Sequence, residues 1–274
     1  ITIKIGGAAG EGIMAAGAIL SKALVRAGLY ISTASEYPSL IRGGHNAYII
    51  RASEEEIFSL VKPVDLLVAL NQETMVLHKD ELSDGAGVIY DADDQKIDLK
   101  ILSGKNLRFF PVPLLKLATE TGGKKLMMNN VAVGAGWALI GLPFEILEGV
   151  IRDIFANKDQ KIIEENIIVA KNGFDQIKNN FPEGFAYKLN LGKAPKRLVL
   201  TGNEAMGLGA IQADLGFAAL YPMTPINGLL TYLAGHSLLT QPEDEIAGIN
   251  MAIGASYAGK RSLVASSGGG FSLM

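Results

Sequence analysis

The strongest constraint in this sequence is a glycine cluster that separates an apolar segment from a helical one. Residues 1–5 (ITIKI) have the composition of a short buried strand, and residues 13–27 carry apolar side chains at helical spacing. Between them lies the run Gly6-Gly7-Ala8-Ala9-Gly10-Glu11-Gly12. Because glycine tolerates the backbone angles of a tight turn, the segment predicts a strand, a turn and a helix.

The same alternation continues along the chain. Helical patterns cover residues 113–121 and 130–156, and strand candidates are residues 30–33, 47–51, 64–70, 87–90 and 107–112. Strands that alternate with helices favour βα units around a mostly parallel sheet. We therefore expect an α/β fold with a Rossmann-like first domain.

The pattern changes near residue 181, where proline, glycine and polar residues indicate an exposed connection. Residues 196–200 (KRLVL) then predict a new strand, which a turn and a helix follow. We place a first domain at residues 1–182, a linker at residues 183–196 and a second α/β domain at residues 197–274. The second domain is shorter than the about 100 to 150 residues usual for a domain, so we expect it to be incomplete.

Composition excludes several classes of protein. The 274-residue chain has no cysteine, which excludes disulfides and thiolate-held zinc or iron–sulphur clusters within it. Its formal net charge of -3 offers no basic field to nucleic acid or an anionic membrane. The longest apolar run, residues 131–144, is shorter than the about 20 residues of a membrane span, and no signal-peptide pattern precedes Ile1. We expect a cytoplasmic protein that binds neither nucleic acid nor membranes.

The first glycine cluster also fits a phosphate-binding pattern. Gly10-x-Gly12-x-x-Ala15 is a permitted form of the dinucleotide fingerprint, in which helix amides face a phosphate. Glu36 lies near the end of the second predicted strand, where an acidic side chain can bind a ribose hydroxyl. Glycines also occur in such turns for backbone reasons alone, so phosphate binding and a purely structural turn both stay open.

A second candidate site is the loop Arg42-Gly43-Gly44-His45-Asn46, which gathers a guanidinium, an imidazole and an amide before a predicted strand. Such a group can bind an anion or line a protein interface, although a lone histidine in a loop is more often only hydrogen-bonded. His78 and His236 are isolated in the sequence too. Since no histidine or carboxylate stands at metal-ligand spacing from His45, we predict no metal site.

A third candidate is the hydroxyl of Thr224 in the segment Tyr221-Pro222-Met223-Thr224-Pro225. The two prolines restrict the backbone on either side, and a hydroxyl held in this way can orient a carboxylate or a phosphate. The alternative is a loop followed by a helix cap.

A fourth candidate is Glu245, which opens a helical pattern rich in small residues. An acidic first turn complements the helix dipole, and this is the structural explanation for Glu243, Asp244 and Glu245. Glu245 is also the acid nearest the apolar run, so a carboxyl group withdrawn from water there can donate a proton.

Taken together, these motifs resemble the 2-oxoacid:ferredoxin oxidoreductases. The gamma region of that family is resembled by Gly10-Glu11-Gly12, Ile41-Arg42-Gly43-Gly44-His45-Asn46 and Met128-Asn129-Asn130-Val131-Ala132-Val133-Gly134-Ala135. The alpha region is resembled by Gly202-Asn203-Glu204-Ala205, Tyr221-Pro222-Met223-Thr224-Pro225, Glu243-Asp244-Glu245-Ile246-Ala247, Gly254-Ala255-Ser256-Tyr257-Ala258-Gly259 and Ser266-Ser267-Gly268-Gly269-Gly270-Phe271-Ser272-Leu273-Met274. The resemblance covers nearly the whole chain, with the alpha region cut short. It implies a Rossmann-like gamma domain followed by the start of a thiamine-diphosphate pyrimidine-type α/β domain.

The resemblance implies a reaction and its participants. A 2-oxo acid is oxidatively decarboxylated to acyl-CoA and CO2, and electrons pass to ferredoxin. Thiamine diphosphate is shared with a beta subunit that holds Mg2+ and an iron–sulphur cluster, and coenzyme A is the co-substrate. We therefore expect a hetero-oligomer, and the sequence does not choose among pyruvate, 2-oxoglutarate, branched-chain and aryl 2-oxo acids.

Residue roles follow from the same resemblance. Glu245 matches the glutamate that bonds the aminopyrimidine ring and favours the tautomer that removes the thiazolium proton. Thr224, beside Tyr221 and Pro222, matches a threonine associated with the substrate carboxylate and coenzyme A. The group that stays a candidate for phosphate or coenzyme A binding, or for an interface, is Gly10, Gly12, Arg42, Gly43, Gly44, His45 and Asn46.

Two departures and two alternatives accompany this interpretation. Ile226-Asn227-Gly228 stands where the family has small hydroxyl residues, and the family's substrate-binding arginine is expected beyond Met274. We therefore expect the chain to be inactive without further polypeptide. The alternatives are an NAD-dependent dehydrogenase, which would use Gly10, Gly12, Ala15 and Glu36, and a non-catalytic scaffold subunit.

Overall fold

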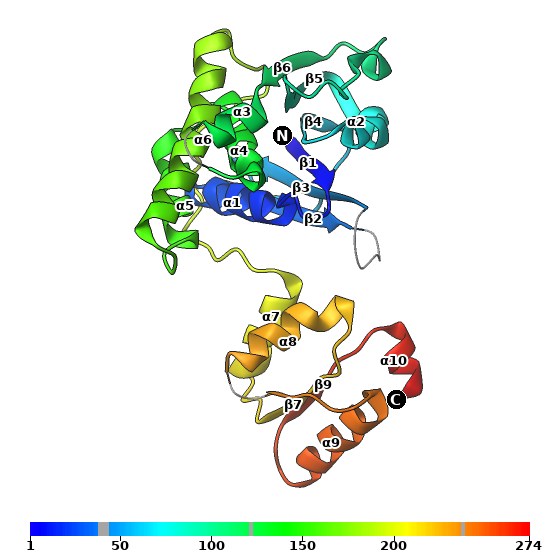
Figure 1. The fold of residues 1–274 in the computed structure, drawn as a ribbon. Helices are drawn as coiled ribbons and strands as arrows, with labels where there is room; N and C mark the ends of the chain where they lie inside the picture. Colours follow the sequence, from blue (N-terminus) through cyan, green and yellow to red (C-terminus); the bar gives the residue numbers. More distant parts are fainter. Residues whose placement is uncertain (38–43, 121–122, 237–238) are drawn as a thin grey trace. The chain divides into compact units, whose positions relative to one another are not determined.

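The computed structural model describes residues 1–37, 44–120, 123–236 and 239–274, which form the two compact units of Figure 1. The first unit is Ile1–Arg197 and the second is Leu198–Met274. Both units combine strands with helices, which confirms the predicted α/β class. The assignment of residues 1–182 and 197–274 as two domains joined by a linker at 183–196 stays a prediction.

A six-stranded sheet forms the centre of the first unit. Its strands are β1 (Thr2–Ala8), β2 (Tyr30–Glu36), β3 (His45–Ser53), β4 (Val64–Ala69), β5 (Leu82–Asp91) and β6 (Arg108–Val112), in the order β2-β3-β1-β4-β5-β6. The pairs β1–β4, β4–β5 and β5–β6 are parallel, whereas β3 pairs antiparallel with β1 and β2. The mostly parallel sheet is confirmed.

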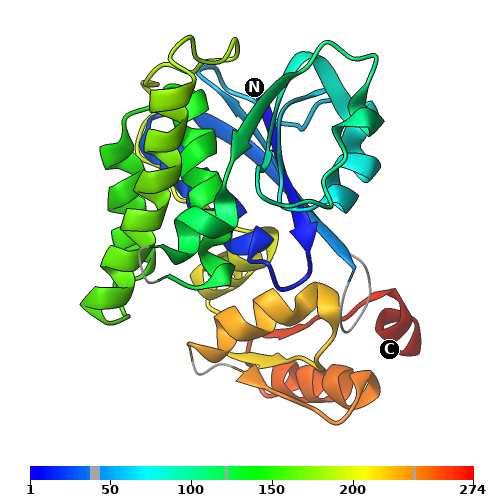
Figure 2. The ribbon, with the colours of Figure 1, turned by 45° about the horizontal axis from the view of Figure 1, so that its top comes forward.

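Helices cover both faces of this sheet, as Figures 1 and 2 show. The larger layer contains α1 (Ile13–Arg26), α3 (Leu114–Thr119), α4 (Met128–Leu139), α5 (Phe144–Ile154) and α6 (Gln160–Asn180), with the 3-10 helix η3 (Lys125–Met127) leading into α4. The other face carries α2 (Gln72–His78) and the 3-10 helices η1 (Lys79–Glu81) and η2 (Leu99–Leu102).

Alternation along β1 divides its side chains between the two faces. Ile3 and Ile5 are buried in the core beneath the larger helical layer. Lys4 lies between them and therefore points to the opposite face, where its ammonium group contacts His78 at the end of α2. The strand thus places one buried charge against the smaller layer.

The predicted helical run over residues 130–156 is wrong as a single element. Helix α4 ends at Leu139 and α5 begins at Phe144, with Gly141, Leu142 and Pro143 between them. A proline lacks the backbone N–H that a continuing helix needs, so the chain turns before it. The result is two short helices packed on the sheet instead of one long one.

The strand predicted at residues 196–200 is also wrong, because these residues form no regular element. The segment before them lies along the first unit. The amides of Gly192 and Ala194 donate to the carbonyl oxygens of Ala27 and Gly28, at 2.9 and 3.0 Å. These two bonds hold the segment against the turn that follows α1.

The second unit contains a three-stranded parallel sheet in the order β8-β7-β9. Its elements are α7 (Gly202–Gln212), β7 (Phe217–Ala219), the 3-10 helix η4 (Thr224–Ile226), α8 (Asn227–Ala234), β8 (Leu239–Thr240), α9 (Glu245–Tyr257), β9 (Ser262–Val264) and α10 (Gly268–Leu273). In Figures 1 and 2, α8 lies on one side of this sheet and α9 on the other.

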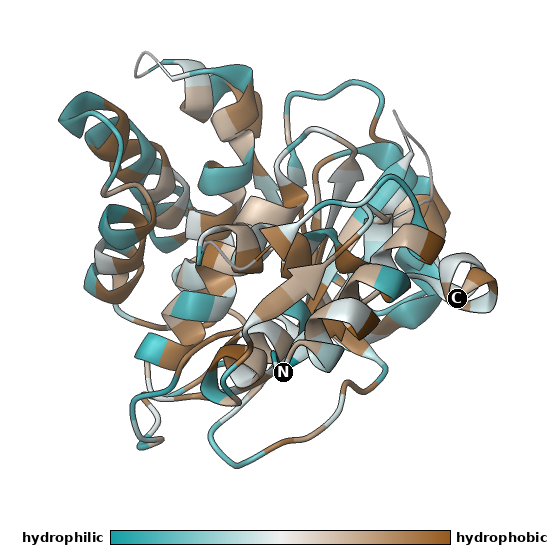
Figure 3. Ribbon diagram, turned by 90° about the horizontal axis from the view of Figure 1, so that it is seen from below, coloured by the Kyte–Doolittle hydropathy of each residue, from teal (hydrophilic) through white to brown (hydrophobic). Residues whose placement is uncertain are grey.

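Small and aliphatic side chains hold the second unit together. Leu220, Leu229 and Leu233 belong to a buried cluster between the sheet and α8. Helix α9 turns Gly248 and Ala252 inward, so its backbone lies close to the sheet. Figure 3 shows brown along many strands and both brown and teal on the helices, as expected for helices with one face on a core. None of the described helices is both long and apolar enough to cross a membrane.

The closest packing in the first unit is between α4 and α6. A Cβ atom added to Gly134 would lie 1.8 Å from the carbonyl oxygen of Ala170, and one added to Gly173 would lie 2.0 Å from that of Val131. The two helix backbones therefore touch at positions where any side chain would force them apart.

We expect Gly134→Ala to lower the free energy of unfolding by at least about 2 kcal/mol, because the new methyl group meets a backbone oxygen. The matched control is Gly136→Ala in the same helix, where the nearest atoms lie at 3.9 Å. This control should change stability by less than about 1 kcal/mol, since alanine also favours the helix. Urea unfolding followed by the fluorescence of Trp137, the single tryptophan, reports on α4. Equal stability of both variants would contradict the close packing.

Candidate functional site

Three motifs of the second unit each follow the carboxyl end of a parallel strand. Residues 221–225 follow β7, Glu245 follows β8, and residues 266–270 follow β9. Because the three strands are parallel, their carboxyl ends share one edge of the sheet. Ligands of open α/β sheets bind outside such an edge. The topology therefore brings together residues that are up to 49 positions apart in the sequence.

Glu245 is the first residue of α9 and is buried, with 8% of its surface exposed. Its neighbour Asp244 caps the helix, since an Asp244 carboxylate oxygen accepts a hydrogen bond from the Ala247 amide at 2.7 Å. No described residue forms a hydrogen bond or an ion pair with the Glu245 carboxylate. An acid on a buried residue needs hydrogen bonds or solvent to offset its cost, which makes Glu245 the candidate acid of this sheet edge.

Two further residues adjoin this carboxylate. A Cβ atom added to Gly270 would lie 2.7 Å from Oε1 of Glu245 and 2.0 Å from Oγ of Ser266. The Ser266 hydroxyl is buried and has no hydrogen-bond partner among the described residues. The sequence placed Ser266 in a motif but assigned it no role, and only the fold shows that it lies beside Glu245.

The segment with Thr224 lies more openly. Thr224 begins η4 and is exposed, Pro222 is exposed, and Tyr221 is half-buried. The Asn203 side-chain amide donates to the carbonyl oxygen of Pro225 at 3.0 Å, which ties this segment to the start of α7. The Thr224 hydroxyl is therefore held on an anchored backbone and faces solvent.

The glycine turn of the first unit contains a carboxylate. Gly10 and Gly12 have φ angles of 93° and 77°, as the turn requires. Glu11 Oε2 accepts a hydrogen bond from the Ala8 amide at 2.7 Å. A Cβ atom added to Gly7 would lie 2.6 Å from the same oxygen. The Glu11 carboxylate thus occupies the inside of the turn, where it opposes an incoming anion.

Two cavities adjoin this turn, and Glu11, Leu70, Lys125 and Met128 line both of them. One has a volume of about 370 Å³ and is mostly apolar, and the other, of about 360 Å³, adds an acidic group and Lys96. Burial raises the pKa of Asp91 in that group, against the opposing effect of backbone amides that donate to it. The acidic group consists of Asp91, Asp93 and Asp94.

The dinucleotide alternative is not favoured by this fold. β1 lies next to β3 and β4, so β2 is not the neighbour of β1 that the dinucleotide pattern requires. Glu36, at the end of β2, lies 3.4 Å from the ammonium nitrogen of Lys4. Its carboxylate is paired with a buried charge and is not presented to a ribose.

The predicted loop with Arg42 and Gly43 lies outside the described residues, but its end is visible. Gly44 O accepts a hydrogen bond from the Ala9 amide at 2.9 Å, and Asn46 pairs with Gly7 in the β1–β3 ladder. The end of this candidate site thus lies against the glycine turn.

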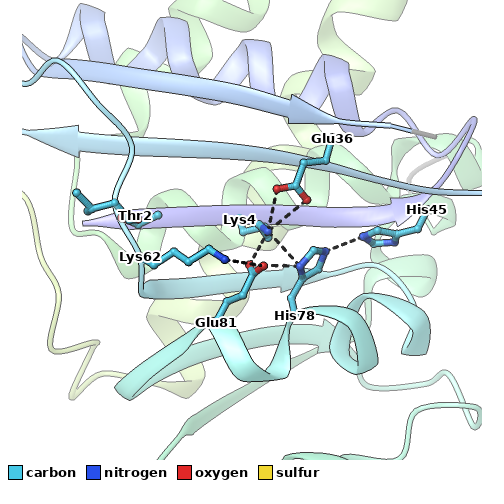
Figure 4. Close-up of polar contacts among 8 residues, drawn as sticks. Thr2, Lys4, Glu36, His45, Lys62, His78 and Glu81 are labelled. Carbon is cyan, nitrogen blue, oxygen red and sulfur yellow. Dashed lines mark hydrogen bonds and ion pairs between the residues drawn. The ribbon is translucent and has the colours of Figure 1, made fainter. Parts of the chain in front are cut away.

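His78 is not isolated in the fold, which corrects the prediction from sequence. Nε2 of His78 lies 2.8 Å from Nε2 of His45, although the two residues are 33 positions apart. The Lys4 ammonium, only 1% exposed, lies 3.0 Å from Nδ1 of His78 and 2.5 Å from Oε2 of Glu81 (Figure 4). Lys4, His45 and His78 therefore form one buried polar cluster, which a linear reading of the sequence does not reveal.

Hydrogen-bond directions assign the protons in this cluster. An ammonium group can only donate, so Lys4 donates to Nδ1 of His78. His78 must then carry its proton on Nε2 and donate to Nε2 of His45. That leaves the proton of His45 on Nδ1, which is buried and has no partner among the described residues. The chain of bonds holds only while both rings are neutral.

No group of three or more histidine, aspartate or glutamate side chains suited to a metal ion occurs among the described residues. The His45–His78 contact is a hydrogen bond between rings, and Lys4 links it to the Glu81 carboxylate.

Two known protein families match successive parts of this sequence. Residues 2–176 match the family described as pyruvate ferredoxin/flavodoxin oxidoreductase. Residues 208–274 match a second description, pyruvate flavodoxin/ferredoxin oxidoreductase, thiamine diphosphate-binding. The two matches fall in the first and second units respectively.

Individual relatives agree with these matches. The chain is 28% identical to 2-oxoacid:ferredoxin oxidoreductase 2, subunit alpha, of Aeropyrum pernix, over 100% of this chain and 52% of that protein. It is 26% identical to the 2-oxoglutarate oxidoreductase subunit KorA of Mycobacterium tuberculosis, over 100% of this chain and 47% of that protein. The chain therefore spans about half the length of the curated relatives it matches.

Solved structures are similar as well. The 2-oxoglutarate:ferredoxin oxidoreductase of Magnetococcus marinus, with 2-oxoglutarate, coenzyme A and succinyl-CoA bound, matches with a TM-score of 0.90 and 31% identity, over 100% of this chain and 48% of that one. The keto/oxoacid ferredoxin oxidoreductase gamma subunit of Geobacter sulfurreducens matches 64% of this chain and 96% of its own, with a TM-score of 0.52 and 23% identity. This second match shows the fold alone.

The histidine pair predicts how the stability of the first unit depends on pH. Burial lowers the pKa of His45 and of His78, and the Lys4 charge lowers that of His78 further. An unfolded histidine has a pKa of about 6.5, so the unfolded chain binds more protons than the folded one below this pH. The pair's contribution is therefore fully present above about pH 6.5 and is lost as the pH falls toward the lowered folded pKa values.

We expect the free energy of unfolding, followed by Trp137 fluorescence, to be lower at about pH 5.5 than at about pH 7.5. His78→Gln should reduce this difference, because glutamine does not titrate. His236→Gln, which replaces an exposed histidine of the second unit, is the control and should leave the difference as it is. An unchanged difference in His78→Gln would contradict the role of the pair.

Proposed function

The chain belongs to the pyruvate ferredoxin/flavodoxin oxidoreductase family, and on that premise we propose that it supplies the gamma and alpha regions of a 2-oxoacid:ferredoxin oxidoreductase. The reaction is the oxidative decarboxylation of a 2-oxo acid to acyl-CoA and CO2, with electrons passed to ferredoxin. The names of its relatives support this class of reaction. The ligands bound in the Magnetococcus marinus structure, a 2-oxo acid and two forms of coenzyme A, agree with it.

The observation that carries the proposal is the position of Glu245, a buried acid that opens α9 at the sheet edge shared by three motifs. The match of residues 208–274 to a thiamine diphosphate-binding family supplies a ligand for it. A carboxylate at this place fits the aminopyrimidine ring, because it can accept a hydrogen bond from a ring nitrogen and return the proton. When bound, thiamine diphosphate supplies the nucleophilic carbon that decarboxylation of a 2-oxo acid requires.

Other residues of the second unit bind and orient the substrates. Glu245 holds a proton at the pyrimidine side of the site. The exposed Thr224 hydroxyl orients the substrate carboxylate or coenzyme A, and Tyr221 and Pro222 hold the backbone on which Thr224 stands. These roles rest on the placement of all three motifs at one sheet edge.

The first unit contributes a site for coenzyme A or an interface. The apolar cavity beside Gly10 and Gly12 is of a size for part of a small ligand. Gly44, His45 and Asn46 lie beside the same turn, and Arg42 and Gly43 complete the motif in the sequence. Because Glu11 fills the inside of the turn, a phosphate would bind there only against its charge.

Further parts of the enzyme lie on partners. We place Mg2+, the diphosphate of the cofactor and the iron–sulphur cluster on a beta subunit, since this chain has no cysteine to hold a cluster. The assembly is a hetero-oligomer that delivers electrons to ferredoxin and is inactive without the beta subunit. The cytoplasmic location expected from the sequence stays a prediction.

The two alternative functions, a dehydrogenase and a non-catalytic scaffold, make different demands on the residues. An NAD-dependent dehydrogenase would need Glu36, which instead pairs with Lys4. A non-catalytic scaffold would have no use for a buried carboxylate without a partner. The scaffold alternative is the one that a single substitution at Glu245 decides.

We expect Glu245→Gln to lower the rate of 2-oxo acid decarboxylation at least about 100-fold in the complex that copurifies with the tagged chain, because a general acid–base group is lost. Release of CO2 and reduction of an artificial electron acceptor measure the rate with pyruvate, 2-oxoglutarate and branched-chain and aryl 2-oxo acids. Glu243→Gln, which replaces an exposed acid two residues away, is the control and should keep its activity. Full turnover in Glu245→Gln would favour the scaffold.

A second substitution tests the glycine turn. We expect Glu11→Gln to raise the affinity of the full chain for coenzyme A about tenfold, because it removes a negative charge from the cavity wall and keeps an acceptor for the Ala8 amide. Titration calorimetry measures the affinity, with the exposed Glu55→Gln as control. If coenzyme A binds to neither variant, the glycine turn is assigned to an interface. Tight binding of NADH in the same titration would favour the dehydrogenase.

A further inference from the structure

Two polar groups of the second unit adjoin the same space. The Ser266 hydroxyl follows β9, and the Glu245 carboxylate opens α9. The hydroxyl is buried and has no hydrogen-bond partner among the described residues. The space between them is the position that a side chain of Gly270 would take, 2.0 Å from Ser266 Oγ and 2.7 Å from Glu245 Oε1.

The two groups are chemically complementary. A hydroxyl can donate one hydrogen bond, and an ionised carboxylate only accepts them. A buried hydroxyl without a partner is costly, so Ser266 gains by meeting an acceptor. Both oxygens border the space beside Gly270, so a rotation of either side chain into it would bring them closer. Gly270 keeps this space open because it has no side chain.

Neither group is needed to stabilise the local fold. Asp244 already caps α9, and Ser267, not Ser266, stands at the cap position of α10. The burial of Ser266 beside Glu245 is therefore not explained by helix capping.

We propose that Ser266 is a positioning residue that donates a hydrogen bond to the Glu245 carboxylate, so that the other carboxylate oxygen faces the aminopyrimidine ring. Gly270 leaves the room in which this bond forms. This inference rests on the proposed function, since it assigns to Glu245 the ring of thiamine diphosphate as its ligand.

The experiment uses the complex that copurifies with the tagged chain, freed of cofactor and titrated with thiamine diphosphate and Mg2+. Ser266→Ala should weaken the binding of thiamine diphosphate about tenfold, as expected for the loss of a hydrogen bond to a charged group. Ser266→Thr keeps the hydroxyl and should restore the affinity to within about threefold. The control Ser256→Ala changes an exposed serine in the last turn of α9 and should bind as the wild type does.

Two further measurements separate positioning from a structural role. The unfolding midpoint of the cofactor-free complex should be the same for wild type and Ser266→Ala. The loss from Ser266→Ala should also disappear when Glu245 is already replaced by glutamine, because residues that act through one another are not additive. Gly270→Ala should weaken binding as well, whereas Gly254→Ala in α9, where a Cβ would meet open space, should not.

The results separate the role of Ser266 from the proposed function of the chain. If Ser266→Ala binds as the wild type does while Glu245→Gln binds weakly, the role of Ser266 is overturned and the proposed function stands. If Glu245→Gln also binds as the wild type does, both fall. A lower unfolding midpoint in Ser266→Ala, without rescue by threonine, would assign Ser266 a structural role and overturn the proposal.

Discussion

Parallel pairing of strands is the constraint on which the candidate sites depend. In a parallel sheet every strand delivers its next residues to the same edge, whatever their separation in the sequence. In the second unit this rule gathers the residues that follow β7, β8 and β9. In the first unit Ala8, Leu70 and Asp91 end or follow β1, β4 and β5, and they line the cavities beside the glycine turn. Both units therefore place their polar groups by topology and not by local sequence.

Alternation within β1 has a second consequence, because it directs a lysine into a covered face. Taking an ammonium group out of water is costly unless charges and hydrogen bonds compensate it. Glu81 and Glu36 supply the opposite charges, and His78 supplies a neutral acceptor. The order of donors then sets the tautomer of each histidine, and the contact between His45 and His78 joins β3 to α2. The groups that offset the cost of burying the Lys4 ammonium therefore also make the contact between β3 and α2 sensitive to protonation.

Local patterns predicted the fold better than they predicted the contacts. The apolar run before the glycine cluster and the apolar spacing of α1 are sufficient to predict both elements, because strand, turn and helix depend on neighbouring residues. The strand end is wrong, since β1 continues through Gly6 and Gly7 to Ala8. Pro143 ends the helical run that the apolar spacing of residues 130–156 predicts, because proline cannot continue a helix. Residues 196–200 have the composition of a strand, yet they form no regular element, because a strand also needs a partner to pair with. The meeting of His45 with His78, and of Ser266 with Glu245, depends on register and packing that no local pattern encodes.

Two explanations of Glu245 make different demands on its surroundings, and from sequence alone the helix dipole is the favoured one. An acidic residue in the first turn of a helix is explained by the helix dipole, provided that it lies near free amides in water. Here Asp244 makes the capping bond, and Glu245 is buried instead of exposed. Burial raises the cost of a carboxylate without a partner, so a role in the dipole alone would favour an exposed side chain. The burial of Glu245 therefore favours the proposed role, in which a ligand completes its hydrogen bonds.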